Sequence, residues 1–412
     1  MLLPKNDMRV LQIEKFFYNR GGSSRVFFDT IDGLRKRGNQ VAEFSMQDNR
    51  NFPSKYEKYF APPLPELKGR LSIAEQFQVF KRLFRSEVIE ERLTQLINDF
   101  KPEVAHIHNA YHHLSASTFL ILAKKKVPTV LTLHDVFPLC PNHSLLVGET
   151  LGERELKNNL FNCLRYKCVD GKFLPSLAGV LEAIYYRRHK VWDNISAYIC
   201  PSHFMADKMV EYGFNREKMR VIPNPFQITP EVLPLGNKIV YLGRLHYEKG
   251  IKIFLRAAEK LRDLPLVVAG SGQDENWVNN FLHEKKLNNV ERVGWVSGDK
   301  WMQIMTEARV VVVPSVFLEN CSVSILEALS YGRLVVASDR GGNPEMVING
   351  KTGFLCRPED PTDLARAIRE AVELSDAEAG KMIKNGRELV QTNHDPDNYF
   401  IALKKVYTEA MS

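Results

Sequence analysis

Short apolar runs rich in β-branched residues alternate with longer stretches of helical periodicity along the whole chain. Five such runs lie in the first half (MRVLQI, QVAEFSM, EVAHIH, TVLTLH and AYIC) and five in the second (KIVYLG, LPLVVAG, VERVGW, VVVVPS and LVVAS). Strands that alternate with helices form parallel sheets with helices on both faces. The sequence therefore predicts an α/β fold built on doubly wound parallel sheets.

The two halves are separated by residues 221–237, VIPNPFQITPEVLPLGN, which contain four prolines and no helical period. Such a composition predicts a linker. We expect a first domain over residues 1–220 and a second over residues 221–394, with a last helix over residues 395–412 that crosses back to the first. Two such domains facing each other would bind a ligand at the carboxyl ends of their strands.

The composition excludes several classes of protein. Six cysteines in 412 residues provide no disulfide framework and suit a reducing compartment. The first residues lack a secretory signal pattern, and no apolar run approaches the roughly 20 residues that span a membrane, so we expect a cytoplasmic protein. The net charge of +7 is either an ordinary solvated surface or an aid to binding phosphate groups or an anionic membrane face. No nucleic-acid-binding motif accompanies it.

Two cations follow the strand KIVYLG in the second half. Arg244 comes directly after Gly243, and Lys249 lies five positions further on. A guanidinium can hold phosphate oxygens in a fork, whereas an ammonium supplies a point charge. At the carboxyl end of a strand these side chains suit a diphosphate, although a solvated loop would show the same letters.

Two glutamates, Glu319 and Glu327, lie eight residues apart in ENCSVSILE, where a loop after the strand VVVVPS leads into a helix. The positive end of such a helix favours a phosphate, and carboxylates accept hydrogen bonds from hydroxyls. Alternatively, Ser324 and Glu327 form a capping box and Glu319 is a solvated loop residue. Together with the two cations, the glutamates indicate a nucleotide-sugar pocket.

These motifs resemble those of a known family. The segments GRLHYEKG and ENCSVSILEALSYGRLVVASDRGGNPEMVINGKTGFL are similar to the retaining glycosyltransferases of family 4 (glycosyl transferases group 1), whose E-x7-E motif is matched by Glu319 and Glu327. In the first half, GGSSRVFFDTIDGLRKRGNQV, TLHD, CPSHFMADKM and VIPNPF match the same family. The resemblance implies the GT-B fold, in which two Rossmann-like domains face each other across a cleft. It also implies a metal-independent hexosyltransferase without a cofactor, which moves a sugar from a nucleoside-diphosphate donor to an acceptor hydroxyl with retention.

The resemblance implies a role for each matched residue. Arg244 and Lys249 would neutralise the diphosphate as it leaves. Glu319 would hold hydroxyls of the donor sugar, and Glu327 those of the ribose. His134 would lie beside the anomeric carbon, which makes His134, Glu319, Arg244 and Lys249 the expected catalytic residues. The other expected donor contacts are a glycine turn against the diphosphate, backbone beside the base and amides facing phosphate and sugar: Gly21, Gly22, Val296, Cys321, Ser322, Val323 and Ser324.

The chain departs from the commonest family pattern in the sugar pocket, where Asn320-Cys321-Ser322 replaces Gly-Phe-Gly. The donor is therefore open between UDP- and GDP-linked sugars. By family habit the acceptor is a glycan or lipid-linked glycan of bacterial-type polysaccharide, lipopolysaccharide or glycolipid assembly. A non-catalytic partner subunit of the same fold and a nucleotide-sugar epimerase are alternatives, and the presence of both cations and both glutamates argues against each.

Three other motifs have simpler interpretations. Asp395-Pro396-Asp397 has the letters of a metal-binding DxD, but it precedes a helix and is interpreted as a turn and N-cap. Gly270-x-Gly272 is only a fragment of a dinucleotide-binding motif. Zinc ligation is an alternative to free buried cysteines, the preferred interpretation, for one irregular group: Cys140, His143, Cys163 and Cys168.

Histidines and basic clusters leave two further alternatives open. Four histidines follow a strand end near the cleft and either help to bind an acceptor or, as preferred, are solvated or hydrogen-bonded: His106, His108, His112 and His113. Lys81-Arg82-x-x-Arg85 and residues 185–190 (YYRRHK) either seat the protein on the inner face of an anionic membrane or form solvated helix faces.

Overall fold

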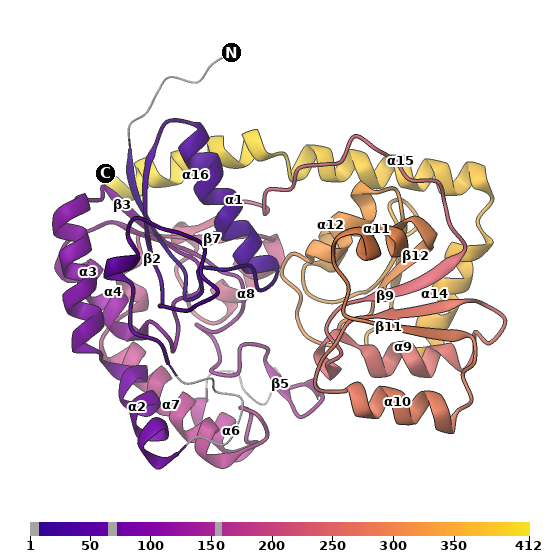
Figure 1. The fold of residues 1–412 in the computed structure, drawn as a ribbon, viewed down its shortest axis with the longest axis horizontal. Helices are drawn as coiled ribbons and strands as arrows, with labels where there is room; N and C mark the ends of the chain where they lie inside the picture. Colours follow the sequence, from indigo (N-terminus) through magenta and orange to yellow (C-terminus); the bar gives the residue numbers. More distant parts are fainter. Residues whose placement is uncertain (1–7, 65–71, 153–158) are drawn as a thin grey trace.

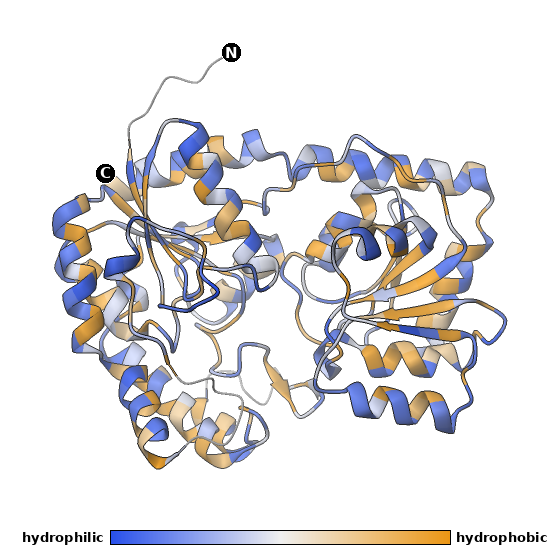
Figure 2. Cartoon of the chain, viewed as in Figure 1, coloured by the Kyte–Doolittle hydropathy of each residue, from blue (hydrophilic) through white to orange (hydrophobic). Residues whose placement is uncertain are grey.

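The structure, a computed structural model, describes residues 8–64, 72–152 and 159–412. Two six-stranded parallel sheets form its centre, one in each half of the chain (Figure 1). Most of their strands are buried and rich in valine, isoleucine and leucine, as expected for parallel sheets covered by helices on both faces. Apolar residues accordingly concentrate along the strands and the inner sides of the helices (Figure 2). The predicted α/β class is confirmed.

The first sheet has the strand order β2-β1-β3-β4-β7-β8. Val10 of β1 pairs with Val41 on one side and with Val104 on the other. The chain therefore moves out from β1 to β2 and returns on the opposite side with β3, so the strand order switches between β1 and β3, where α/β folds bind ligands. The strands are β1 (Arg9–Ile13), β2 (Gln40–Phe44), β3 (Val104–Ile107), β4 (Thr129–Thr132), β7 (Ala197–Cys200) and β8 (Met219–Val221).

The second sheet has the order β11-β10-β9-β12-β13-β14 and begins at its centre. Val240 of β9 pairs with Val267 of β10 and with Val311 of β12, so the strand order switches between β9 and β12. The two loops that carry the predicted cations and glutamates follow these two strands. The strands are β9 (Lys238–Leu242), β10 (Leu266–Ala269), β11 (Val290–Gly294), β12 (Ala308–Val313), β13 (Leu334–Ser338) and β14 (Phe354–Cys356).

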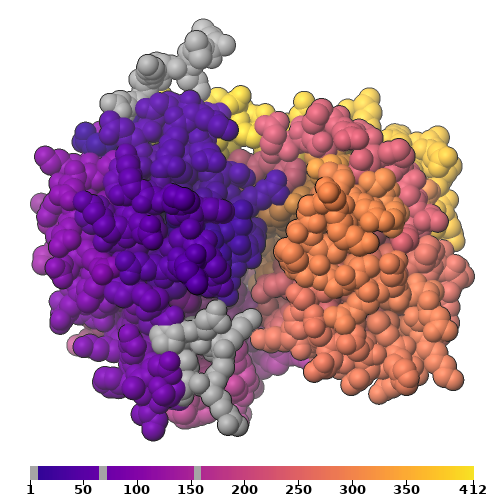
Figure 3. Space-filling model, in the orientation of Figure 1, coloured from indigo at the N-terminus to yellow at the C-terminus, as the bar shows by residue number. Residues whose placement is uncertain are grey.

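Helices flank both sheets (Figure 1). Those of the first domain are α1 (Gly22–Lys36), α2 (Ile73–Phe84), α3 (Glu87–Phe100), α4 (Ser115–Lys124), α6 (Leu160–Arg165), α7 (Phe173–Arg188) and α8 (His203–Glu211). Those of the second are α9 (Ile251–Ala258), α10 (Glu275–Glu284), α11 (Gly298–Glu307), α12 (Val323–Ser330), α13 (Asn343–Met346), α14 (Pro361–Glu373) and α15 (Asp376–Asn393). In the space-filling view a furrow separates the two halves (Figure 3).

The last helix, α16 (Pro396–Met411), packs on the first sheet. Asp395 caps it, because its Oδ1 accepts a hydrogen bond from the amide of Asn398 at 2.9 Å, which confirms the N-cap interpretation. Gly33 of α1 leaves room for Phe400, since a Cβ there would stand 1.9 Å from the ring. In Figure 1, α15 and α16 run along both domains in yellow.

The chain crosses between the domains twice, in residues 222–237 and between α15 and α16. The two crossings are hydrogen-bonded to each other: Nδ1 of His394 donates to the carbonyl of Asn224 at 2.9 Å, and the amide of Phe226 donates to the carbonyl of His394 at 2.8 Å. The expected start of the second domain, residue 221, is the last residue of β8.

All ten runs interpreted as strands form strands. The sequence does not predict β8, β14 or the hairpin of β5 (Leu146–Val147) and β6 (Thr150–Leu151), because strands of two or three residues are too short to show a period. Among the described residues, no helix combines the length and apolar character needed to cross a membrane.

Candidate active site between the two domains

The loop after β9 is fixed by its own backbone and by a required glycine. The hydroxyl of Tyr241 donates to the carbonyl of Arg244 at 2.7 Å. The short helix η4 (Tyr247–Lys249) then ends at Gly250, whose φ of 75° lies in the left-handed region. A Cβ at Gly250 would stand 1.8 Å from the carbonyl oxygen of Pro314, so only glycine lets the loop pack against the end of β12. The position of Lys249 is set by this contact.

Glu319 lies buried in the loop after β12. Its Oε1 accepts hydrogen bonds from Nζ of Lys249 at 2.8 Å and from Oγ of Ser315 at 2.6 Å. The same Nζ lies 4.5 Å from the centroid of the Phe317 ring. The structure thus brings Lys249 and Glu319, 70 residues apart in sequence, into direct contact.

Gly341 and Gly342 pack against the backbone of the loop after β12 that carries Glu319, which we call the acidic loop. The amide of Gly342 donates to the carbonyl of Glu319 at 2.6 Å. A Cβ on Gly341 would stand 2.2 Å from that oxygen, and one on Gly342 would stand 2.0 Å from the carbonyl oxygen of Asn320. The glycine pair therefore permits a close backbone approach that fixes the acidic loop.

The helix after the acidic loop, α12, begins at Val323 with Ser322 as its N-cap. The amides from Cys321 to Ser324 lie at this start, where N–H groups lack intrahelical acceptors and the helix dipole is positive. The alternative of a capping box by Ser324 and Glu327 is wrong, because Ser324 is the second helical residue and no described side chain caps the helix. Glu327 lies one turn inside the helix.

A second helix start meets α12 from the first domain. α1 begins at Gly22, and Gly21 precedes it as N-cap. A Cβ on Gly22 would lie 3.0 Å from Cγ2 of Val323, so the two helix starts pack closely. Because both helices present their positive ends here, the position between them favours an anion such as a diphosphate.

Arg25, a residue that the sequence analysis missed, links the two helices. Its Nη1 lies 2.8 Å from Oε1 of Glu327, and its guanidinium lies 4.9 Å from the centroid of the Phe226 ring. Burial raises the pKa of Glu327, although the Arg25 guanidinium acts against this. One feature of the sequence could have indicated Arg25. It lies three to four residues after Gly21 and Gly22, and this helical spacing places its side chain one turn from the predicted glycine turn.

His134 follows β4 at the carboxyl edge of the first sheet. Its Nε2 lies 2.9 Å from Nδ1 of His108, and the two rings are stacked with centroids 5.2 Å apart. Burial lowers the pKa of His134 to about 4, so its imidazole is neutral at pH 7. The side-chain amide of Asn320 donates to the carbonyl of Leu133 at 2.5 Å, which holds the acidic loop beside His134.

Two further contacts tie the second domain to α8 of the first. Oγ of Ser202 donates to Oδ1 of Asn320 at 2.7 Å. The carboxylate of Glu345 accepts from the amides of His203 and Phe204 at 2.8 and 2.7 Å, and so caps the start of α8 from the other domain. Sequence reasoning missed Asn320 and Glu345 as bridging residues, because local patterns carry no information about contacts between domains.

Arg244 and Val296 form no hydrogen bond or ion pair through their side chains with the other predicted site residues in the described part of the chain. Arg244 is exposed, and within the described ranges its guanidinium has no salt bridge, so its charge remains available to a ligand. Val296 is half-buried on the loop after β11 and packs on the same hydrophobic cluster as Cys321 and Val323.

Two family models match the chain across both domains. The Glycosyltransferase Family 4 model matches residues 20–229, and the Glycosyl transferases group 1 model matches residues 231–389. The chain belongs to glycosyltransferase family 4. The matched ranges include every site residue predicted from the sequence.

Relatives of this glycosyltransferase differ in how much of it they cover. Glycogen synthase of Mycobacterium tuberculosis is 30% identical over 178 residues, 42% of this chain and 42% of the relative, so the match spans less than half of that protein. O-antigen chain mannosyltransferase C of Escherichia coli is 22% identical over 411 residues, 97% of this chain and 98% of the relative. The solved structure of HepE from Anabaena in complex with UDP has a TM-score of 0.65 at 17% identity and covers 97% of this chain and 100% of that one. The glycosyltransferase has the GT-B fold.

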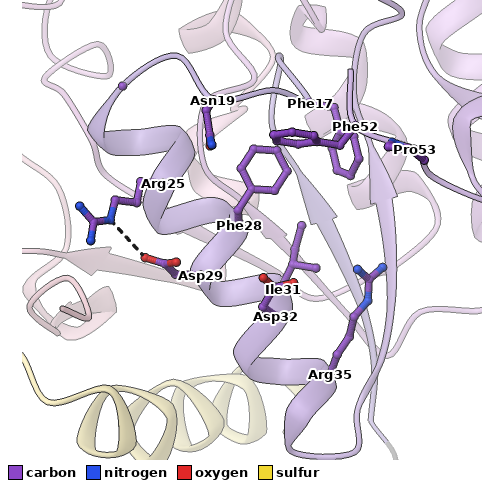
Figure 4. Close-up of a pocket in the computed structure, with 11 residues that line it drawn as sticks. Phe17, Asn19, Arg25, Phe28, Asp29, Ile31, Asp32, Arg35, Phe52 and Pro53 are labelled. Carbon is purple, nitrogen blue, oxygen red and sulfur yellow. Dashed lines mark ion pairs between the residues drawn. The ribbon is translucent and has the colours of Figure 1, made fainter. Parts of the chain in front are cut away.

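A cavity of about 700 Å³ adjoins the site on the first domain of the glycosyltransferase. Gly21 and Arg25 form part of its wall, and the rest comes from the loop after β1, from α1 and from the loop after β2 (Figure 4). Its lining combines the rings of Phe28 and Phe52 with carboxylates such as that of Asp32. Aromatic faces together with carboxylates can bind the apolar faces and the hydroxyls of a sugar.

The zinc alternative has no support in the glycosyltransferase. His143 is engaged elsewhere, with Nδ1 2.9 Å from Asp135 and Nε2 2.8 Å from Nε2 of His112. The neighbouring Cys140 thiol and burial raise the pKa of Cys163 to about 12. Among the described residues, no group of three or more suitable side chains is arranged to hold a metal ion.

The other histidines and the glycine fragment have structural roles. His106 and His108 are buried, and Nε2 of His106 bonds the hydroxyl of Thr132 at 2.7 Å, so the hydrogen-bonded interpretation holds for both. A Cβ on Gly270 would stand 1.8 Å from the carbonyl oxygen of Gly243. The fragment Gly270-x-Gly272 therefore allows one loop to pack on the loop that carries Arg244.

Proposed function

We propose that this protein transfers a sugar from a nucleoside-diphosphate donor to a hydroxyl of a glycan acceptor, with retention of anomeric configuration. The contact of Lys249 with Glu319, beside two converging helix starts at the switch point of the second sheet, carries the proposal. It combines a cation and positive helix ends for a diphosphate with a carboxylate for sugar hydroxyls. The solved structure of HepE with UDP is consistent with such a donor.

In the proposed reaction the bond from the anomeric carbon to the diphosphate breaks while the acceptor oxygen bonds to the same face of that carbon. The acceptor proton passes to an oxygen of the leaving phosphate, so the step needs no protein nucleophile. Arg244, Lys249 and the starts of α1 and α12 would stabilise the charge that develops on the leaving group. On this basis we propose that no metal is required.

The remaining residues would position the donor. Glu319 would accept from hydroxyls of the sugar, and Glu327 from those of the ribose after exchanging its contact with Arg25. His134, neutral at pH 7, would accept or donate a hydrogen bond beside the anomeric carbon without adding a charge. Val296 would lie near the base.

We propose that the acceptor is a growing polysaccharide or lipid-linked glycan and that the reaction takes place in the cytoplasm at the inner face of a membrane. The relative with the fullest coverage reported above is an O-antigen chain mannosyltransferase, which supports this class of product. The cavity beside α1 is the proposed place for acceptor sugars, because it opens next to the turn at Gly21.

The test is calorimetric titration with UDP and with GDP, each in the presence of EDTA. One nucleotide should bind the wild type, and Arg244→Ala should weaken that binding strongly. Arg256→Ala, which removes an exposed charge from α9 in the same domain, is the matched control and should change nothing. Equal binding by wild type and Arg244→Ala would exclude Arg244 from the diphosphate site. Failure of both nucleotides to bind the wild type would favour a non-catalytic subunit.

A further inference from the structure

The helix α2 presents apolar side chains to solvent. Ile73, Phe77 and Phe80 recur at i, i+4 and i+7 and are 87%, 68% and 40% exposed. With about 100° of rotation per residue they form one stripe. Buried Arg82 lies on the opposite side of the helix. Single exposed apolar residues are normal in soluble proteins, whereas a continuous stripe marks a surface that contacts something.

The neighbouring helices α6 and α7 also expose large apolar side chains. α7 packs against both α2 and α6, and the ring of Phe84 on α2 lies 5.4 Å from that of Tyr185 on α7. The three helices lie together at one end of the first domain (Figure 1), and orange apolar residues are visible on them in Figure 2. We define the apolar surface as the large exposed apolar residues of these helices: Ile73, Phe77, Phe80, Phe161, Phe173, Leu174, Leu181 and Ile184.

Exposed basic residues lie on the same two helices, α6 and α7, as part of the apolar surface. Residues 159–190, which form α6, α7 and their ends, include one exposed carboxylate, that of Asp170. The same residues include six exposed basic side chains: Arg165, Lys167, Lys172, Arg187, Arg188 and Lys190. Large apolar side chains flanked by lysine and arginine are typical of surfaces that lie in the headgroup region of anionic lipids.

The basic cluster predicted at the end of α2, Lys81-Arg82-x-x-Arg85, does not form a fully exposed basic face. Arg82 is buried, and its Nε donates to the carbonyl of His113 at 2.7 Å. Arg85 pairs with Glu90 at 2.8 Å. The charge at this end of the domain comes mainly from α6 and α7, and the contact area comes from the apolar stripe.

We propose that the apolar surface docks this glycosyltransferase onto an anionic lipid membrane. The proposal rests on the proposed function, since a lipid-linked acceptor would enter the cleft from the membrane. α7 is joined to the cleft directly, because Nδ1 of His112, on the loop after β3, lies 2.6 Å from the carboxylate of buried Glu182 on α7. Docking through α2, α6 and α7 would therefore hold the loop after β3, at the carboxyl edge of the first sheet, close to the lipid.

The test is flotation of the full chain with two kinds of vesicle, phosphatidylcholine alone and phosphatidylcholine mixed with phosphatidylglycerol. The wild type should float with the anionic vesicles only, and less as salt is raised. The variant Phe77→Ser/Leu174→Ser should lose at least about tenfold in vesicle affinity, since each change removes a large exposed apolar side chain that would enter the lipid. Trp295→Ser removes an aromatic residue that is 71% exposed in the second domain and should float like the wild type.

Three outcomes would overturn the proposal. In the first, the wild type does not float with anionic vesicles. In the second, the double variant floats as well as Trp295→Ser. In the third, the wild type sediments as a dimer that the double variant converts to a monomer, which would make the apolar surface an interface between two copies. Nucleotide titration of the same samples separates these outcomes from failure of the proposed function, because the double variant lies outside the donor site and should bind nucleotide like the wild type.

Discussion

Replacing Gly250 by alanine should damage the donor site through the backbone alone. The added Cβ would have to move from 1.8 Å to 3.0 Å or more from the carbonyl oxygen of Pro314. An alanine at a φ of 75° also carries left-handed strain of about 1–2 kcal/mol. The clash adds about 1–3 kcal/mol, the usual cost of overpacking. We therefore expect a total loss of about 2–5 kcal/mol.

Gly350 offers a matched control in the same domain. Its φ is 73°, but a Cβ there meets nothing within 4 Å, so Gly350→Ala reports the strain without the clash. For a domain of this size each kcal/mol lowers the melting temperature by about 2–4 °C. Calorimetric scans should place Gly350→Ala a few degrees below wild type and Gly250→Ala roughly twice as far below.

Turnover should separate the two variants further. A shift of about 1 Å at Gly250 would disrupt the 2.8 Å contact of Lys249 with Glu319, and such misplacement costs on the order of 100-fold in rate. Gly350→Ala should keep its rate. The reasoning would be refuted if Gly250→Ala melted at the same temperature as Gly350→Ala and the two variants turned over donor at similar rates.

Two further predictions concern the first domain. Burial raises the pKa of Glu14 to about 8 from 4.5, so the folded protein holds an extra proton between these values and loses stability as the pH rises from 4.5 to 8. Between pH 4.5 and pH 8 the melting temperature of Glu14→Gln should therefore fall less than that of the wild type. Parallel plots of melting temperature against pH for the two proteins would contradict this. Phe52→Ala, which removes an exposed ring from the wall of the cavity beside α1, should raise the KM for acceptor several-fold and leave nucleotide binding unchanged. An unchanged acceptor KM would exclude this cavity as the acceptor site.

The sequence predicts those parts of the molecule that local patterns encode. The ten longer strands have clear periods, and Lys249 and Glu319 follow strands that turn out to be neighbours at the switch point. The contact of Arg25 with Glu327 and that of Asn320 with Leu133 depend on how the domains face each other, which no local period records. The stripe of Ile73, Phe77 and Phe80 is visible in the sequence, but the same spacing would equally describe a face packed in a core.

The hydrogen bonds between the two crossings of the chain restrict how the enzyme can open. A single flexible connection would leave one domain free to rotate in any direction, whereas two crossings bonded through His394 and Asn224 hold the domains together at two linked points. We therefore expect the domains to open by rotation about an axis that passes through these crossings. The largest travel then falls at the opposite end of the furrow, where Glu149 in the turn of the β5–β6 hairpin pairs with Lys252 of α9 (Figure 1). That remote ion pair would part first, well before the contacts around Phe226 change.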